Sequence, residues 1–291
     1  MGFASLTHAE REDFWNLWFS ELVKGHVGMT YKVKKILYSG QSRFQRIDVL
    51  DTHEYGRMLV LYGSVMFTER DDFVYHEMMA HVSYYSHGGP SSALVIGGGD
   101  GLTARELLKH SSIRSVVVVD IDEMVVERCK EFFPESKAAL DDPRVKVRFA
   151  DGAEFVRKTD ERFDIVLVDS SDPVPPSDVL FRREFFENCK RCLGPGGILI
   201  AQTESPFYNP DVIKEVYASL REIFRIVKPM VAWIPTYPSA LWSFAFCSDE
   251  RHPVEGFDRK AFLADKIATK YYNEEIHAAA FALPAFVRSL L

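Results

Sequence analysis

Four acidic residues end or follow four consecutive apolar runs, and their spacing makes them the best candidates in the sequence for a functional site. Asp100, Asp120, Asp151 and Asp169 each stand where a short run of aliphatic residues stops. Such runs predict buried parallel strands, and the carboxyl ends of parallel strands share one ligand-binding edge of the sheet. Each aspartate alone also suits a turn or a helix N-cap, Asp151 in particular. Four of them in register predict an acidic site, and therefore a cationic ligand.

The first acid lies in a glycine-rich turn between an expected strand and an expected helix. The glycines follow a G-x-G-x-G spacing from Gly97 to Gly101, which differs from the dinucleotide fingerprint G-x-G-x-x-G. A loop that binds phosphate uses backbone N–H groups, so the carboxylate of Asp100 indicates a ligand that carries an amine. Asp120, 19 positions after Gly101, is placed to accept hydrogen bonds from ribose hydroxyls. The pattern favours an S-adenosyl compound over NAD.

The fourth acid opens the segment Asp169-Ser170-Ser171-Asp172-Pro173. Two acids three positions apart at a strand end form a compact negative site. Like charges held together raise the pKa of one carboxyl, which suits a general base. A turn with an aspartate cap explains one of the two acids, but it does not explain both.

The elements that must position these acids form an alternating α/β pattern from Ser91 onward. The expected strands cover 93–97, 114–120, 144–149, 163–169, 198–202, 226–234 and 242–247. The expected helices cover 102–110, 123–132, 181–193 and 210–223, with a short one after Asp151 and more beyond residue 258. The pattern predicts an α/β fold with a seven-stranded Rossmann-like sheet of the methyltransferase type.

The residues before this sheet predict a second, smaller domain. An amphipathic pattern over 9–24 predicts a helix, and alternation over 29–67 predicts small antiparallel β-structure. A helix from about 72 to 86 follows, which Thr68 or Asp71 could cap. We therefore expect an N-terminal helix and β-strand domain at 1–70 and a Rossmann-like catalytic domain at 71–291. The small domain is expected to form oligomers and part of the active-site wall.

Composition and the remaining motifs exclude several classes of function. A formal net charge of −7 argues against nucleic-acid binding, and there is no membrane-spanning run or signal core. The four cysteines suggest a reducing compartment, and we expect a cytoplasmic protein. His76 and His81 are five apart, which does not match the spacing of a helical zinc site, so we expect no metal.

Several segments together resemble the spermidine synthase (polyamine aminopropyltransferase) family. They run from about residue 30 to the C-terminus and include Ser42-Arg43-Phe44-Gln45, the run from Thr68 to Met78, Gly97-Gly98-Gly99-Asp100-Gly101, Asp120-Ile121-Asp122, Asp151-Gly152, Asp169-Ser170-Ser171-Asp172-Pro173, Gln202 and Ile234-Pro235-Thr236-Tyr237-Pro238-Ser239. The resemblance implies transfer of an aminopropyl group from decarboxylated S-adenosylmethionine, a co-substrate, to a diamine, usually putrescine. It implies no prosthetic group. The products would be spermidine and 5'-methylthioadenosine.

The resemblance also implies a role for each matching residue. Asp169 would be the general base, assisted by Tyr75. The donor would be bound by Gln45, Gly97, Asp100, Asp120, Asp151 and Gly152, with Asp100 on its aminopropyl ammonium. The amine substrate would be bound by His76, Asp100, Asp172, Gln202 and Tyr237. A loop around residues 170–180 would close over the site.

Departures from the family pattern leave the acceptor open. Met66 and His76 stand where glutamine is frequent, Pro175 stands where glycine is usual, and Asp120 stands where many members have glutamate. Agmatine, cadaverine or a longer polyamine are alternative acceptors. A methyltransferase and a non-catalytic polyamine-binding paralogue are alternatives of other classes. Members of the family are commonly dimers or tetramers, and we expect a homodimer or homotetramer.

Overall fold

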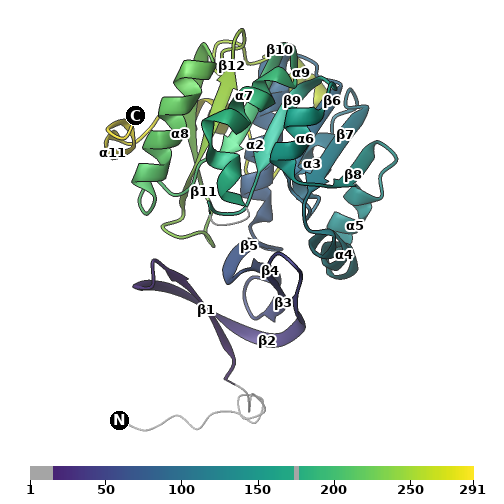
Figure 1. Ribbon diagram of the computed structural model, residues 1–291, viewed down its shortest axis with the longest axis vertical. Helices are drawn as coiled ribbons and strands as arrows, with labels where there is room; N and C mark the ends of the chain where they lie inside the picture. Colours follow the sequence, from purple (N-terminus) through teal and green to yellow (C-terminus); the bar gives the residue numbers. More distant parts are fainter. Residues whose placement is uncertain (1–15, 174–176) are drawn as a thin grey trace. The chain divides into compact units, whose positions relative to one another are not determined.

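The computed structural model describes residues 16–173 and 177–291, which divide into two compact units. The smaller unit takes in the chain up to Gln41 together with Gln45–Arg70. The larger unit takes in Ser42–Phe44 and Asp71–Leu291. Each unit contains one β-sheet (Figure 1). Among the described residues, no helix combines the length and the apolar character needed to cross a membrane.

The smaller unit is a five-stranded antiparallel sheet in the order β1-β2-β3-β4-β5. Its strands are β1 (Trp18–Val23), β2 (Val27–Gln41), β3 (Arg46–Thr52), β4 (Arg57–Leu61) and β5 (Ser64–Thr68). An apolar cluster that includes Tyr31, Met58 and Val60 is buried in this unit. The alternation over 29–67 arises because successive side chains of a strand point to opposite faces, and the expected antiparallel β-structure is confirmed.

The expected helix over residues 9–24 is wrong where the structure describes it. Residues 18–23 are strand β1, which pairs antiparallel with β2 along its whole length. Lys24 and Gly25 turn the chain with positive φ angles of 50° and 73°. The segment forms a strand despite the helical spacing of its aromatic residues. Pairing with β2 through this tight turn supplies hydrogen bonds to the backbone N–H and C=O groups along the segment. Residues 9–15 lie outside the described residues.

The larger unit holds a seven-stranded sheet in the order β11-β12-β10-β9-β6-β7-β8. Its strands are β6 (Ser92–Gly97), β7 (Ser115–Asp120), β8 (Val145–Phe149), β9 (Phe163–Asp169), β10 (Leu193–Gln202), β11 (Ile226–Trp233) and β12 (Leu241–Ser248). Strand β12 runs antiparallel to both neighbours, and the other pairs are parallel. This is the expected methyltransferase-type sheet. Strand β10 begins earlier than expected, because the Gly194–Gly197 turn forms an irregularity within it.

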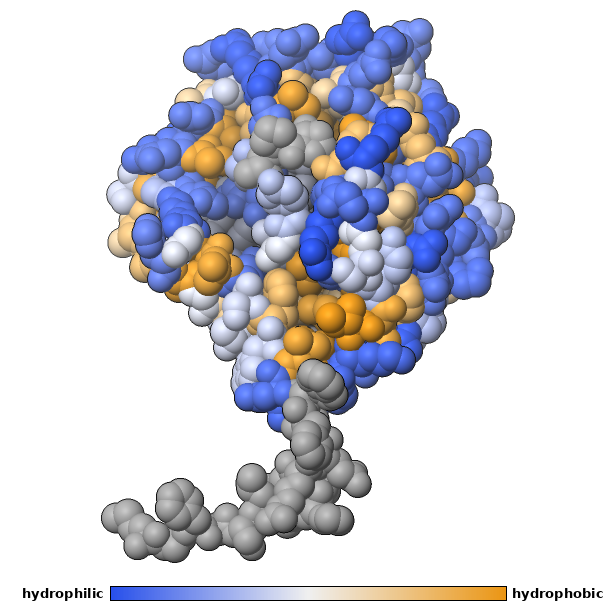
Figure 2. All heavy atoms as spheres, turned by 60° about the horizontal axis from the view of Figure 1, so that its bottom comes forward, coloured by the Kyte–Doolittle hydropathy of each residue, from blue (hydrophilic) through white to orange (hydrophobic). Residues whose placement is uncertain are grey.

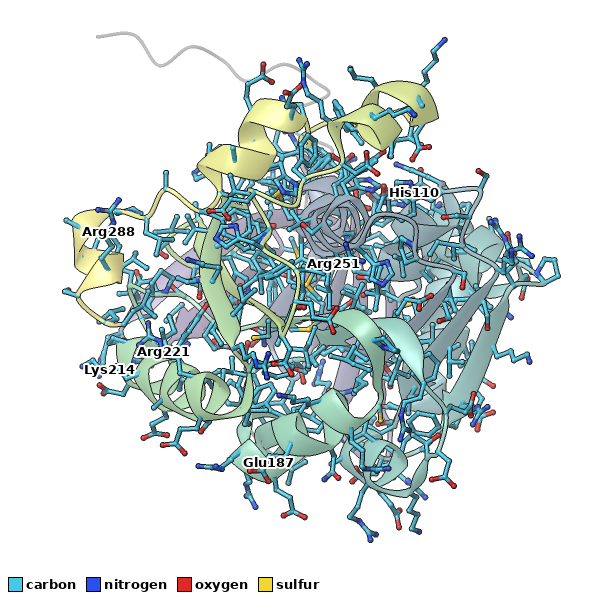
Figure 3. The ribbon with its side chains drawn as sticks, turned by 90° about the horizontal axis from the view of Figure 1, so that it is seen from above. His110, Glu187, Lys214, Arg221, Arg251 and Arg288 are labelled. Carbon is cyan, nitrogen blue, oxygen red and sulfur yellow. The ribbon has the colours of Figure 1, made fainter. Side chains whose placement is uncertain are left out.

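Helices cover both faces of this sheet. They are α2 (Asp72–His87), α3 (Leu102–Leu108), α4 (Glu123–Phe132), α5 (Pro134–Leu140), α6 (Gly152–Lys158), η1 (Ser177–Phe181), α7 (Arg183–Arg191), α8 (Pro210–Ile223), α9 (Arg259–Asp265), α10 (Glu274–Ala279) and α11 (Ala285–Arg288). Apolar residues of α2 and α3 pack on one face, and those of α6, α7 and α8 pack on the other. Figure 3 shows Glu187 on the side of α7 that faces away from the sheet.

The strand register brings the expected acids to one edge of the sheet. Strand β6 lies between β7 and β9, and Gly97 pairs with Asp169 across the β6–β9 ladder. Asp120 is the last residue of β7, next to β6 on the other side. The glycine-rich turn after β6 therefore lies between the carboxyl ends that carry Asp120 and Asp169.

Candidate active site

The glycine-rich turn lies directly against the end of β9. Gly97 has φ +78°, and a Cβ atom at this position would lie 2.1 Å from the Asp169 carbonyl oxygen. The backbone amide of Gly98 donates a hydrogen bond to that same oxygen at 3.0 Å. A glycine is required at position 97 because any side chain would collide with backbone that cannot move. The close approach places Asp100 and Asp169 at the same site.

Asp120 is held as an acceptor at the end of β7. The backbone amide of Gly99 donates to its Oδ2 at 2.9 Å, and the amide of Asp122 donates to its Oδ1 at 2.8 Å. Burial raises the pKa of Asp120 to about 6, although these two hydrogen bonds favour the charged form. Each carboxylate oxygen has a further lone pair for a ligand hydroxyl.

Three hydrogen-bond acceptor groups converge near the carboxylate of Asp120. One ligand atom from each of His76, Asp100 and Asp169 lies within 4.8 Å of the other two. Burial raises the pKa of both Asp100 and Asp169, and the nearby charge of Asp169 adds to the effect on Asp100, whose pKa reaches about 8. A cation that enters this triangle relieves the cost of burying negative charge.

His76 takes part in this triangle as a neutral acceptor. Its Nδ1 lies 2.6 Å from the Asp72 carbonyl oxygen, which can only accept, so Nδ1 carries the proton. Nε2 then presents a lone pair and lies 3.9 Å from Asp100 Oδ1. Burial, followed by the charge of Arg105, lowers the pKa of His76 to about 3. A primary ammonium has three N–H donors, which matches three convergent acceptors.

The carboxylate of Asp169 is oriented by two hydroxyl groups. Thr103 Oγ1 donates to Asp169 Oδ2 at 2.6 Å, and the Tyr75 hydroxyl forms a second hydrogen bond. Both bonds lower the pKa of Asp169, but burial outweighs them and the pKa is raised. The ring of Tyr75 lies 6.1 Å from that of Tyr237, which packs on Trp242 at 4.7 Å. A buried carboxyl with a raised pKa beside these rings suits a general base.

A second group of polar side chains follows β10. Gln202 donates from Nε2 to the Ser170 carbonyl at 3.1 Å and to Glu204 Oε1 at 3.2 Å. Asn209 Nδ2 donates to Glu204 Oε2 at 2.6 Å. Burial and the charge of Asp172 raise the pKa of Glu204 to about 8. The buried Glu204 and the partly buried Asp172 therefore form a second acidic pair that favours a cation.

Some expected site residues have structural contacts of their own. Asp151 caps helix α6, where its Oδ1 accepts from the Glu154 amide at 2.9 Å. A Cβ atom on Gly152 would lie 2.5 Å from Ile96 Cγ2, so glycine lets α6 approach β6. Neither contact tests the expected role of these residues in binding the donor. Gln45 belongs to the smaller unit, and Pro175 of the expected closing loop lies outside the described residues.

Sequence reasoning missed Glu204 and Thr103. Glu204 did carry a signal, because it follows the fifth parallel strand just as an acid follows each of the other four. It is also held with a positive φ of 74°, which a non-glycine residue seldom adopts. Thr103 lies inside α3 and reads as an ordinary helix residue. Its contact with Asp169 depends on how α3 packs, and no local pattern reveals it.

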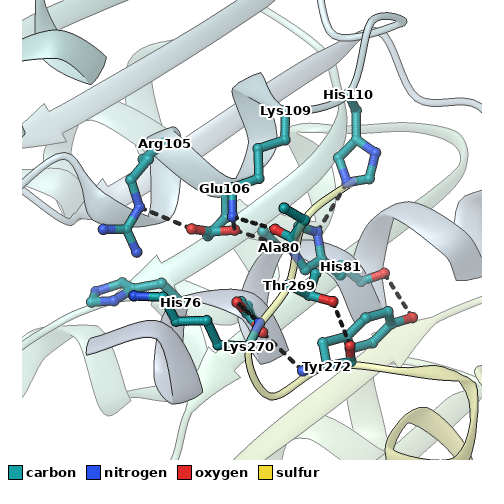
Figure 4. A network of polar contacts seen from close by, with 12 residues as sticks. His76, Ala80, His81, Arg105, Glu106, Lys109, His110, Thr269, Lys270 and Tyr272 are labelled. Atoms are coloured by element: carbon teal, nitrogen blue, oxygen red, sulfur yellow. Dashed lines mark hydrogen bonds and ion pairs between the residues drawn. The ribbon is translucent and has the colours of Figure 1, made fainter. Parts of the chain in front are cut away.

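His76 and His81 face different surroundings, although both lie on α2. His81 Nε2 lies 3.1 Å from Glu106 Oε2, and His81 Nδ1 lies 3.0 Å from His110 Nε2 (Figure 4). His76 and His81 therefore do not share a ligand. His76, Asp100 and Asp169 could together coordinate a cation, so our expectation of a site without metal stays a prediction.

Comparison with known proteins identifies both units. The family model "Spermine/spermidine synthase domain" matches residues 72–256, and "Spermidine synthase tetramerisation domain" matches residues 17–69. A polyamine aminopropyltransferase of Bacillus subtilis is 44% identical over 275 residues, which cover 94% of this chain and 99% of that protein. One from Bacillus mycoides is 42% identical with the same coverage.

Solved structures of the same class superpose on the chain. A spermidine synthase in complex with the transition state analogue AdoDATO has a TM-score of 0.92 and 39% sequence identity. The spermidine synthase from Thermotoga maritima has a TM-score of 0.91 and 39% identity. Each comparison covers 94% of this chain and 94% of the other.

Proposed function

The chain belongs to the spermine/spermidine synthase family and is a polyamine aminopropyltransferase, and from this premise we propose its substrates and mechanism. The donor is decarboxylated S-adenosylmethionine, and no prosthetic group takes part. The preferred acceptor is putrescine, and the products are spermidine and 5'-methylthioadenosine. Direct displacement at the aminopropyl carbon, with Asp169 as general base, connects them.

The acceptor triangle of His76, Asp100 and Asp169 is the observation that carries this proposal. The aminopropyl ammonium of the donor fits the triangle, with Asp100 as its principal partner. The ribose hydroxyls then bind Asp120, while Gln45, Gly97, Asp151 and Gly152 line the nucleoside. Intact S-adenosylmethionine would bring its carboxylate toward buried acids, which repel it. This repulsion argues for the decarboxylated donor and against a methyltransferase.

The acceptor binds between the two acidic groups. Asp172 and Glu204 hold the far ammonium of the diamine, with Gln202 and Tyr237 beside the chain. The near amine is protonated in water and has no lone pair for attack, so it must first transfer a proton to Asp169. Its nitrogen then forms a bond to the aminopropyl carbon as the carbon–sulfur bond breaks. The bonding electrons move to sulfur, which leaves as a neutral thioether.

The enzyme therefore contributes alignment and deprotonation. The sulfonium is already an activated leaving group, so no metal ion is needed to polarise it. Tyr75 orients the carboxylate of Asp169 through its hydroxyl. Holding the amine in line with the carbon–sulfur bond converts a two-molecule encounter into a reaction within one complex.

A panel of amines tests the substrates. The protein is incubated with decarboxylated S-adenosylmethionine and putrescine, agmatine, cadaverine or spermidine, and release of methylthioadenosine is followed by chromatography. We expect the highest kcat/KM with putrescine and no methyl transfer from intact S-adenosylmethionine. A higher kcat/KM with another amine would replace putrescine as the acceptor. No release with any amine would exclude the proposed reaction.

The smaller unit supports an oligomer. We expect a homotetramer, because residues 17–69 match a tetramerisation domain and the unit exposes Trp18, Leu22 and Ile36. Figure 2 shows groups of apolar side chains, drawn in orange, between hydrophilic ones. Sedimentation equilibrium measures the mass directly. Charged substitutions at Trp18 and Leu22 should lower it, and an unchanged mass would place the interface elsewhere.

A further inference from the structure

Asp71 occupies the N-cap position of helix α2, yet its side chain makes no cap hydrogen bond. Its Oδ2 instead accepts two hydrogen bonds from Thr236, from the backbone amide at 2.9 Å and from the hydroxyl at 2.6 Å. Both residues are buried, with exposed fractions of 4% and 0%. An aspartate at an N-cap ordinarily accepts from an amide two or three positions later. Here the carboxylate is directed to a loop 165 positions away.

The loop that receives this contact has an unfavourable backbone. Residues 234–240 connect β11 to β12, and Ser239 and Ala240 both have positive φ angles, of 63° and 57°. Left-handed backbone is unfavourable for residues with a Cβ atom, so the loop needs contacts that hold it. A second contact joins Ser205 and Ser239, whose hydroxyls lie 2.9 Å apart. Backbone hydrogen bonds within the loop, such as that from the Ala240 amide to the Tyr237 carbonyl at 2.8 Å, shape the turn, and the side-chain contacts of Thr236 and Ser239 tie it to its surroundings.

The same contact joins the segments that carry the two tyrosines of the candidate site. Tyr237 follows Thr236 directly in the chain, and Tyr75 lies about one helical turn after Asp71. Their rings lie 6.1 Å apart at 57°, and the Tyr75 hydroxyl bonds the carboxylate of Asp169. The contact therefore joins the two chain segments that carry these rings.

We propose that the contact between Asp71 and Thr236 is a clasp that positions Tyr237 against Tyr75 for aminopropyl transfer. Both are positioning residues, and the inference rests on the function proposed above. Hydrogen bonds to a buried carboxylate are strong because the group is charged and water is excluded. Loosening the clasp lets the strained loop relax, so the acceptor amine is aligned less often. The donor nucleoside, which binds at Asp120, is not affected.

Substitutions at Thr236 test the clasp, with a matched control elsewhere in the sheet. Thr236→Val keeps the shape and removes the hydroxyl, and Thr236→Ser restores it. The control is Ser92→Ala, because Ser92 donates its amide and its hydroxyl to Asp164 Oδ2 at 3.0 and 3.1 Å. This pair has the same chemistry but lies where β6 and β9 begin, away from the ligand edge.

Steady-state kinetics give the first result. We expect Thr236→Val to lower kcat/KM for the diamine about tenfold, the equivalent of one hydrogen bond to a charged group. Thr236→Ser and Ser92→Ala should stay close to the parent protein. The affinity for methylthioadenosine, measured by calorimetry, should be the same in all four proteins. If Thr236→Val gives the same kcat/KM as the Ser92→Ala control, the proposal is overturned.

A second measurement does not depend on turnover. With 3-fluorotyrosine incorporated, the fluorine resonance of Tyr237 is assigned from its loss in Tyr237→Phe. We expect Thr236→Val to move this resonance and Ser92→Ala to leave it unmoved. An unmoved resonance overturns the clasp, and so does a moved resonance with unchanged kcat/KM. If the parent protein transfers to no amine, the proposed function fails, while a moved resonance still supports the positioning of Tyr237.

Discussion

Replacing Asp169 with asparagine removes the proposed base and leaves the shape of the site intact. Asparagine has nearly the same volume, but its amide cannot accept a proton at neutral pH. The hydroxyls of Thr103 and Tyr75, which donate to Asp169, can rotate to accept from the new amide N–H. The substitution therefore leaves no buried polar group without a partner, and we expect Asp169→Asn to fold.

The expected loss follows from the role of the group. A positioned general base contributes about 10²- to 10⁴-fold in rate. At about 1.4 kcal/mol for each tenfold, the barrier should rise by about 3 to 5 kcal/mol. Donor affinity should fall much less than turnover, because Asp120 and Asp100, the principal partner of the donor's ammonium, are retained. Burial raises the pKa of Asp169, so the carboxylate is a stronger base than an exposed aspartate.

Single-turnover release of methylthioadenosine, measured by rapid quench across pH, separates this role from simple misfolding. Without the base, the acceptor must lose its proton to water before it binds. The rate of Asp169→Asn should therefore rise about tenfold per pH unit toward the amine pKa of about 10, whereas the parent protein should level off earlier. Asp164→Asn, at the opposite end of β9, is the control and should keep the parent rate. Near-parent turnover in Asp169→Asn, or the same pH profile as the parent, would refute the reasoning.

Four further predictions concern neighbouring groups. Burial and the charge of Asp169 raise the pKa of Asp100 to about 8 from an ordinary 3.8. The folded state therefore binds this proton more tightly than the unfolded state does. The contribution of Asp100 to the free energy of unfolding consequently falls as the pH rises from about 4 through about 8. The Tm of Asp100→Asn minus that of the parent should therefore be larger at pH 9 than at pH 5, and equal differences would contradict the assignment. Glu204→Gln should raise KM for the diamine about tenfold, because it removes one charge opposite the far ammonium. The affinity for methylthioadenosine, measured by calorimetry, should not change. An unchanged KM would show that Glu204 does not belong to the acceptor site. His76→Gln should retain kcat/KM and His76→Phe should lose it, because a neutral acceptor suffices; equal losses would show that the imidazole itself is required. Dialysis against EDTA should leave turnover unchanged, and a loss that a divalent cation restores would establish a metal site.

The order of residue types in the sequence predicted the acidic edge of the sheet, and this prediction required no knowledge of tertiary contacts. Asp100, Asp120 and Asp169 stand at strand ends, and a strand end is visible in sequence because an apolar run stops there. In the structure the same three lie around the glycine-rich turn. The resemblance added His76 and Tyr75, which the helical pattern alone could not distinguish from core residues.

The N-terminal segment shows where local pattern is insufficient. Aromatic residues over 9–24 repeat at helical spacing, yet Trp18–Val23 form a strand. A strand obtains its hydrogen bonds from a partner, here β2, so its stability depends on residues outside the segment. Only the turn at Lys24 and Gly25 carried a local signal for the hairpin.

The sequence by itself determined the sheet and the row of acids at the ends of its strands, because apolar runs and the residues that end them are local properties. From these acids it also predicted a cationic ligand. Only the tertiary structure decided which side chains share the site. Thr103 reaches Asp169, Glu204 forms an acidic pair with Asp172, and Asp71 bonds Thr236 rather than its own helix. Each of these contacts joins two elements that are far apart in the sequence and that packing brings together. The residue types that make the contacts also occur commonly in caps and turns, so they do not indicate a distant partner. A hydrogen bond to a distant partner depends on where that partner lies, which no window of sequence contains.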